Sequence, residues 1–152
     1  MTELDLKMTG GVSGEELERV LEEKMPPIAR KVVLIDFDDT IAPFGYLFGF
    51  PEPFPGISKF TRSLKDQGYT IGIFTSRLSP TWMRSADTEN NVKRFERNQR
   101  NYIDDYCERF DIEYDFATAE KVPCEAYIDD KAVRFEGSWA PIAERWAIDV
   151  TE

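Results

Sequence analysis

The fold class is indicated most clearly by the segment Val32-Val33-Leu34-Ile35-Asp36-Phe37-Asp38-Asp39-Thr40. Its first four residues form a continuous apolar run rich in β-branched side chains. Such a run predicts a strand buried on both faces, as in a parallel sheet. The strand ends in acidic residues and a threonine. Because ligands of an open parallel sheet bind beyond the carboxyl ends of the strands, the same stretch also predicts a polar site.

The rest of the chain alternates helix and strand patterns. Apolar side chains at helical spacing predict helices over 14–25, 56–67, 92–110 and 138–145. Short apolar runs predict strands over 69–74, 112–118, 125–128 and 146–150. We therefore expect an α/β domain of three α/β/α layers around a mainly parallel sheet. Residues 1–13 are expected to form a tail, and 14–152 a single domain.

Composition excludes several classes of function. The chain has 152 residues, enough for one ordinary domain, and a net charge of −10, which argues against broad binding to nucleic acid or anionic membranes. It has no histidine, which removes His-based triads, general bases and metal ligands. Its two cysteines are too few for a disulfide framework or a four-thiolate zinc site. With no membrane span or signal peptide in the pattern, we expect a cytoplasmic location.

Polar side chains gather where three of the predicted strands end. They are Asp36 and Asp38, Thr75 and Ser76, and Asp129 and Asp130, with Lys121 in the loop before the last pair. Crowded carboxylates repel each other, so the site needs either bound protons or a cation. All-oxygen ligands favour a hard ion, for which Mg²⁺ is the natural choice. An ion beside a lysine and a hydroxyl suits a phosphoryl group, although each residue taken alone is more typical of a turn, a cap or a solvated surface.

In this order the motifs resemble those of the haloacid dehalogenase-like superfamily, in its magnesium-dependent phosphatase branch. The match runs from about 32 to 131, and that family has a Rossmann-like fold. The resemblance implies that Asp36 is the nucleophile that forms an aspartyl-phosphate. It also implies that Asp38 is the acid/base that protonates the leaving oxygen and then activates water. The presence of Asp38 favours phosphoryl transfer over carbon–halogen cleavage.

The resemblance further assigns the ion and the phosphate. Magnesium is implied to bind the Asp36 side chain, the Asp38 backbone carbonyl and the pair Asp129 and Asp130, of which we favour Asp130 as the direct ligand. The residues implied to hold the phosphate are Thr75, Ser76 and Lys121, and Lys121 is also expected to restrain Asp36. At Asp39 the chain departs from the commonest family pattern, which has glycine there. This departure adds negative charge at the mouth of the site.

The spacing of the motifs leaves no room for a large cap domain. Asp36 and Thr75 are 39 positions apart, and Thr75 and Lys121 are 46 apart, which the predicted helices and strands nearly fill. Residues 41–55, rich in Gly, Pro and aromatic residues, are expected to form a small flap. Its aromatic residues, Tyr46 among them, are candidates for stacking on substrate, although we favour their packing against the domain. Arg77, two residues after Thr75, is the other candidate for touching substrate.

Taken together, these patterns predict a magnesium-dependent phosphomonoesterase or phosphotransferase. Its expected partner is a phosphorylated small molecule or a phosphorylated polymer end, and not a membrane or a long nucleic acid. Two alternatives stay open. One is a non-hydrolytic phosphate-binding or regulatory module of the same fold, and the other is transfer of the phosphoryl group to an acceptor other than water. The sequence leaves the substrate and the oligomeric state open.

Overall fold

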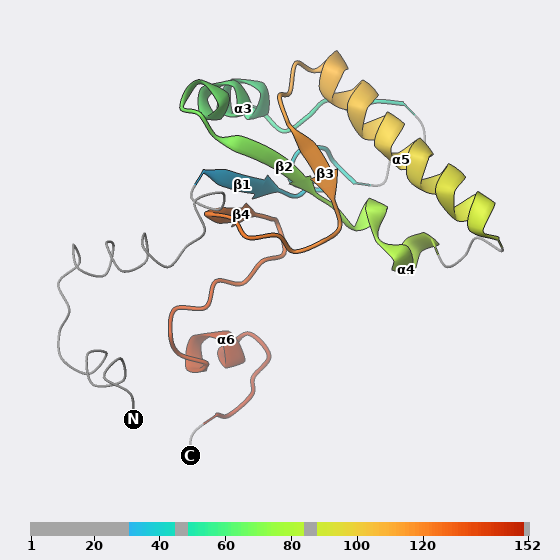
Figure 1. The fold of residues 1–152 in the computed structure, drawn as a ribbon. Coiled ribbons are helices and arrows are strands. Elements are labelled where there is room, and N and C mark those ends of the chain that lie inside the picture. Colours follow the sequence, from blue (N-terminus) through green and yellow to red (C-terminus); the bar gives the residue numbers. More distant parts are fainter. Residues whose placement is uncertain (1–30, 45–48, 84–87, 151–152) are drawn as a thin grey trace, which may run out of the picture.

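The computed structural model describes residues 31–44, 49–83 and 88–150, apart from the side chains of residues 82 and 83 (Figure 1). The helix expected at 14–25, the tail before it and Tyr46 lie outside these ranges. The strands of the described chain form one parallel sheet in the order β3-β2-β1-β4. Their bounds are β1 Val32–Ile35, β2 Thr70–Phe74, β3 Phe116–Thr118 and β4 Ala126–Ile128.

The first strand lies inside the sheet, as its apolar run predicts. Val33 pairs with Ile71 of β2 on one side and with Ala126 of β4 on the other, and all four β1 side chains are buried. Because β1, β2 and β4 are parallel neighbours, their carboxyl ends meet at one edge of the sheet. That edge is where the polar residues after each strand are placed.

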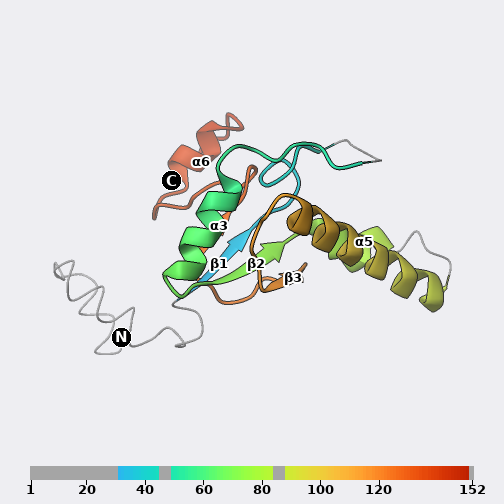
Figure 2. The same cartoon turned by 90° about the horizontal axis from the view of Figure 1, so that it is seen from above.

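Helices cover one face of this sheet. Figures 1 and 2 show α3 (Ile57–Asp66) and α5 (Glu89–Arg109) on the same side of the strands, and a shared core joins them there. Alternate strand residues such as Ile35 and Ile73 pack in this core with Ile103 and Tyr106 of α5. Both helices were expected from apolar spacing, and α3 ends before Gly68, whose φ of 81° suits glycine. The smaller helices are η2 Ser76–Leu78, α4 Pro80–Met83 and α6 Ala140–Glu144.

The opposite face of the sheet is apolar but carries no helix of the described chain. Leu34 and the ring of Phe116 close over Gly72, where an added Cβ would lie 2.4 Å from Leu34 Cδ2. On the same face the rings of Phe74 and Tyr127 meet edge to face, 5.7 Å apart, and Tyr127 is 37% exposed. Figure 1 draws α6 apart from these strands. The structure thus shows an α/β fold with one helical layer, and the third layer stays a prediction.

Two predicted strands differ from what is found. Residues 146–150 form no strand, because the backbone N–H of Ile148 donates to the Ala143 carbonyl and turns the chain back onto α6. The strand expected at 112–118 is only Phe116–Thr118. Its first half is diverted by a left-handed Asp111 (φ 55°), and the Asp115 carboxylate accepts the Ile71 N–H in place of a strand partner.

The flap expected at 41–55 is anchored on α5 at its second half. Tyr102 donates its hydroxyl hydrogen to the Gly49 carbonyl, Tyr106 donates to the Pro51 carbonyl, and the Phe50 ring stacks on Tyr102 at 5.4 Å. Phe50 therefore packs against the domain, which is the interpretation the sequence favoured. Within the described ranges, no helix has the length and apolar character needed to cross a membrane.

Candidate functional site

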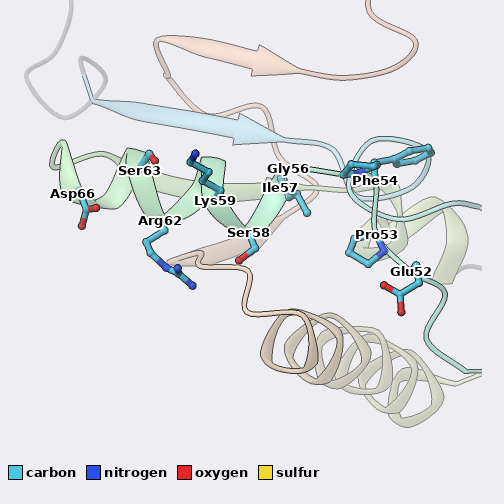
Figure 3. A pocket seen from close by; sticks show the side chains of 11 residues that line it. Glu52, Pro53, Phe54, Gly56, Ile57, Ser58, Lys59, Arg62, Ser63 and Asp66 are labelled. Atoms are coloured by element: carbon cyan, nitrogen blue, oxygen red, sulfur yellow. The ribbon is translucent and has the colours of Figure 1, made fainter.

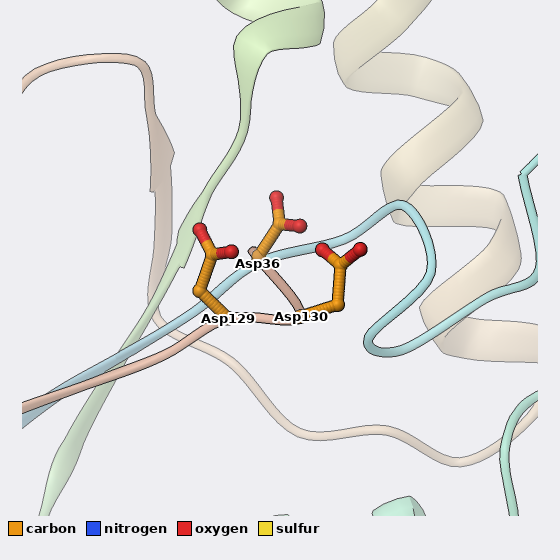
Figure 4. A group of neighbouring side chains, drawn as sticks. All are labelled: Asp36, Asp129 and Asp130. Carbon is orange, nitrogen blue, oxygen red and sulfur yellow. The ribbon is translucent and has the colours of Figure 1, made fainter. Parts of the chain in front are cut away.

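Three carboxylates meet at the carboxyl edge of the sheet. Asp36 follows β1, and Asp129 and Asp130 follow β4 (Figure 4). The N–H of Asp36 donates to the Ile128 carbonyl at 2.8 Å, which extends the pairing of the two strands to the site itself. One oxygen from each of the three carboxylates lies within 4.8 Å of the others. We call these three residues the acidic cluster.

A turn after β1 brings Thr40 back to the acidic cluster. The N–H groups of Ile41 and Ala42 both donate to the Phe37 carbonyl, and Phe37 and Ile41 anchor the turn in the core. The Thr40 hydroxyl accepts the N–H of Asp130 at 3.1 Å and lies 3.5 Å from an Asp36 carboxylate oxygen. Thr40 therefore links the ends of β1 and β4. The sequence interpretation gave it no role, although it closes the motif that contains Asp36.

The acidic cluster is electrostatically unfavourable without a cation. Desolvation by burial and then the charge of Asp129 raise the pKa of Asp36 to about 7, although a hydrogen bond from the Phe37 backbone opposes the shift. The charges of Asp130 and Asp38 raise this pKa further. Near neutral pH the cluster thus favours a bound proton or a bound positive ion.

The donor set of the acidic cluster fits a hard divalent ion. Opposite ligands of Mg²⁺ lie about 4.2 Å apart and adjacent ones about 3 Å apart in octahedral geometry. The three oxygens lie within 4.8 Å of one another, so the side chains would have to move closer together to reach these spacings. Carboxylates are also the ligands that such ions prefer, so Asp36, Asp129 and Asp130 could hold a magnesium ion.

Asp38 has different surroundings, because Arg77 binds both of its carboxylate oxygens. Arg77 donates from Nε to Oδ2 at 2.8 Å and from Nη2 to Oδ1 at 2.7 Å. Its remaining terminal nitrogen donates to the Gln99 side-chain oxygen on α5 at 3.1 Å. The guanidinium also lies over the rings of Tyr102 and Phe37, at 5.1 and 5.5 Å from their centroids. Sequence reasoning missed Gln99 and Tyr102, because nothing in a linear pattern connects them to Asp38.

The three residues expected to hold phosphate do not all lie at the carboxyl edge of the sheet. Thr75 is buried at the end of β2, and its hydroxyl accepts the Arg77 N–H, which caps the short helix η2. Ser76 begins η2 and is exposed. Lys121 is also exposed, and its ammonium lies over the Tyr127 ring, 5.7 Å from the centroid. Thr75 and Ser76 are thus at the carboxyl edge, whereas the Lys121 side chain is directed to the ring of Tyr127, on the face of the sheet opposite to α3 and α5.

Asp39 has a backbone conformation that is uncommon for a residue other than glycine. Its φ is 59°, in the left-handed region that favours glycine, and aspartate is among the residues that tolerate it. One Asp39 carboxylate oxygen accepts the Phe44 N–H at 2.8 Å, which fixes the start of the flap. The hydrogen bond to the Phe44 N–H therefore holds Asp39 in a conformation that glycine would adopt more readily.

A groove of about 900 Å³ lies away from these carboxylates (Figure 3). It runs along one side of α3 from the base of the flap, between Glu52 and Asp66, and neither Asp36 nor Asp38 lines it. The carboxyl edge and the groove are therefore separate features, and the candidate chemistry belongs to the edge.

Comparison of the chain with known proteins adds no assignment to this geometry. No protein-family model, curated protein or solved structure matches it. What the site does must therefore be argued from its own residues.

Proposed function

We propose that the protein is a magnesium-dependent phosphomonoesterase or phosphotransferase of the haloacid dehalogenase-like kind, with Asp36 as its nucleophile. The observation that carries this proposal is the acidic cluster, whose three carboxylates converge at the carboxyl edge of a parallel sheet. A nucleophilic carboxylate and two further ion ligands on neighbouring strands are what such a reaction requires.

The ion and the phosphate have distinct ligands in this proposal. Asp36, Asp129 and Asp130 hold Mg²⁺ together with the backbone carbonyl of Asp38. When bound, the ion neutralises the phosphoryl oxygens and reduces their repulsion of the attacking carboxylate. The phosphate is held by Thr75, Ser76 and Lys121, and Lys121 must leave the Tyr127 ring to reach it.

The reaction proceeds in two balanced steps. An Asp36 carboxylate oxygen attacks phosphorus, the ester P–O bond breaks, and the leaving oxygen takes a proton from Asp38. A water molecule, or another hydroxyl acceptor, then attacks the phosphorus of the aspartyl-phosphate. Its proton passes to Asp38, the bond from phosphorus to Asp36 breaks, and phosphate or the new ester is released.

The proposed substrate class is supported by the lack of a cap domain among the described residues next to the carboxyl edge of the sheet. We propose a phosphorylated small molecule or polymer end that approaches without passing a cap domain, because the described part of the flap is tied to α5. Tyr46 remains a proposed substrate contact, whereas the role of Arg77 depends on its pairing with Asp38. We also propose that the sheet is covered on both faces in a three-layer α/β/α arrangement, since the face bearing Leu34 and Tyr127 is apolar and carries no helix of the described chain.

One observation is compatible with the non-hydrolytic alternative as well as with catalysis. Arg77 engages both oxygens of Asp38, the residue that has to carry the proton. A module that only binds phosphate would have no use for a free Asp38. Measuring turnover distinguishes the two functions, because only a phosphatase releases phosphate from its substrate.

The deciding experiment is phosphate release from a broad panel of phosphate esters, with Mg²⁺ or with a chelator. Wild type, Asp36→Asn and Asp66→Asn are compared, the last being a matched control on an exposed aspartate at the end of α3. We expect magnesium-dependent release in wild type and Asp66→Asn, and none in Asp36→Asn. Release by Asp36→Asn would refute the nucleophile assignment. Absence of release from every ester by wild type would favour the binding module.

A further inference from the structure

Arg77 forms an ion pair with Asp38, one of the two aspartates that follow β1. It follows β2, it is separated from Asp38 by 39 positions, and it binds both carboxylate oxygens of that residue. We propose that Arg77 is a positioning residue that orients Asp38 for the attack of water on the aspartyl-phosphate, rather than a contact for the substrate. This inference rests on the proposed phosphoryl transfer through Asp36.

The pair has the geometry of a fixed clamp. A planar guanidinium that meets a carboxylate through two parallel hydrogen bonds restricts both its position and its rotation. The pair is also sheltered, since the side chains of Arg77 and Asp38 are only 23% and 18% exposed. Lysine, with a single rotating ammonium, cannot reproduce this arrangement.

Contacts from α5 hold Arg77 itself in place. Gln99 accepts a hydrogen bond from Nη1, and Tyr102, three residues further along the same helix, lies against the guanidinium plane. Phe37, next to Asp38 in the chain, lies 5.5 Å from the guanidinium carbon. The Arg77 backbone is fixed as well, because its N–H donates to the Thr75 hydroxyl. The orientation of Arg77 is therefore determined before any substrate arrives.

These contacts leave little of the guanidinium for a substrate. Three of its five N–H groups are already used, and aromatic rings lie against the group. Each Asp38 oxygen, in contrast, keeps a lone pair that can accept a proton from water. The clamp thus serves Asp38 without blocking the proton transfer that the second step requires.

The two roles predict opposite kinetics with 4-nitrophenyl phosphate. Its leaving group departs without needing a proton, so forming the aspartyl-phosphate does not depend on Asp38, whereas hydrolysing it does. A misoriented Asp38 therefore makes hydrolysis rate-limiting and lets the aspartyl-phosphate accumulate. Loss of a substrate contact would instead weaken binding and leave no accumulation.

The test is pre-steady-state and steady-state turnover of this ester by wild type, Arg77→Ala, Arg77→Lys, Asp38→Asn and the double variant Asp38→Asn/Arg77→Ala. We expect Arg77→Ala to lower kcat about tenfold or more, with KM falling in parallel. A burst of 4-nitrophenolate equal to the enzyme concentration should precede the slow phase. Arg77→Lys should show the same burst with a smaller loss, and the double variant should be no slower than Asp38→Asn.

Arg100→Ala is the matched control, because it removes an α5 arginine that binds Glu96 and the Ala117 carbonyl instead of Asp38. It should show wild-type kinetics without a burst. A raised KM with unchanged kcat in Arg77→Ala, or additive losses in the double variant, would overturn the positioning role and restore the substrate contact. Inactive wild type would overturn the proposed function and this inference together, whereas active wild type with unaffected Arg77 variants would overturn this inference alone.

Discussion

Asp36 and Asp38 stand two positions apart after the same strand, yet they meet opposite electrostatic surroundings. Asp36 faces Asp129 and Asp130, and its pKa is raised to about 7 by burial and by those charges. Asp38 has its charge met by Arg77 through two hydrogen bonds. The difference separates two tasks. In the proposed reaction, Asp36 binds the ion and attacks phosphorus, whereas the charge of Asp38 is already paired with Arg77.

The largest expected effect comes from removing the Asp36 carboxylate. Asp36→Asn keeps the shape of the side chain but loses the attacking oxygen, so turnover should fall by about a thousandfold or more. Phosphate release per enzyme in the presence of Mg²⁺ measures this loss. Circular dichroism should show unchanged secondary structure, because the substitution leaves the core intact.

The second prediction concerns the ion at the acidic cluster. Asp130→Asn removes one of the three carboxylates proposed to bind Mg²⁺, so Mg²⁺ affinity should fall by about 10- to 100-fold. Titration calorimetry with Mg²⁺ alone measures this without any need for substrate. Asp38→Asn is the contrasting variant, since its side chain belongs to the clamp with Arg77 and not to the acidic cluster. Equal losses of Mg²⁺ affinity in the two variants would contradict the separate roles proposed for the side chains of Asp130 and Asp38.

The third prediction uses the pKa of Asp36. Its folded value of about 7 lies above the ordinary 3.8, so the folded state binds more protons between these pH values. Unfolding free energy must therefore fall as pH rises from about 4 to 7. Because Asp36 is only half-buried, solvent screening limits the change to about 1–2 kcal/mol. Urea unfolding of the metal-free protein measures it as the difference between wild type and Asp36→Asn.

Added magnesium should reverse this trend. The ion binds the charged form of Asp36, so wild type should gain stability with rising pH when Mg²⁺ is present, while Asp36→Asn gains less. The difference in unfolding free energy between wild type and Asp36→Asn should therefore change with pH. A difference that stays constant with pH, both with and without Mg²⁺, would contradict the unfavourable electrostatics of the acidic cluster.

The same contrast shows how far sequence reasoning reached. The strand β1 was predictable from its continuous apolar run, and the helices α3 and α5 from apolar side chains that repeat with the helical period. Parallel strands then bring Asp36, Asp129 and Asp130 to one edge, so their proximity also followed from the sequence. The run at 146–150 looked like a strand because of its composition alone, but Ile148 hydrogen-bonds to α6. Apolar residues do not become a strand without a partner strand.

The pairing of Asp38 with Arg77 could not be predicted from the sequence in this way. Asp38 and Arg77 are separated by 39 positions, and Gln99 lies 22 beyond Arg77, so their meeting depends on how η2 and α5 pack. From the sequence, Arg77 was assigned to the substrate because it follows Thr75. Lys121 was likewise assigned to the phosphate by its place in the motif order, whereas the structure shows it over Tyr127.

The smallest expected effect is at Asp39, which adjoins Asp38. Glycine adopts the left-handed backbone of this position (φ 59°) without the strain of about 1 kcal/mol that a side chain brings. Losing the hydrogen bond from the Phe44 N–H costs a similar amount. Asp39→Gly should therefore change the unfolding free energy by less than about 1 kcal/mol. Asp39→Asn keeps an acceptor and removes only the charge, so it should be neutral in stability and lower KM modestly for an anionic ester. If Asp39→Asn instead lowered kcat as Arg77→Ala does, Asp39 would join Arg77 in orienting Asp38, and the division between the two aspartates would extend along the whole turn.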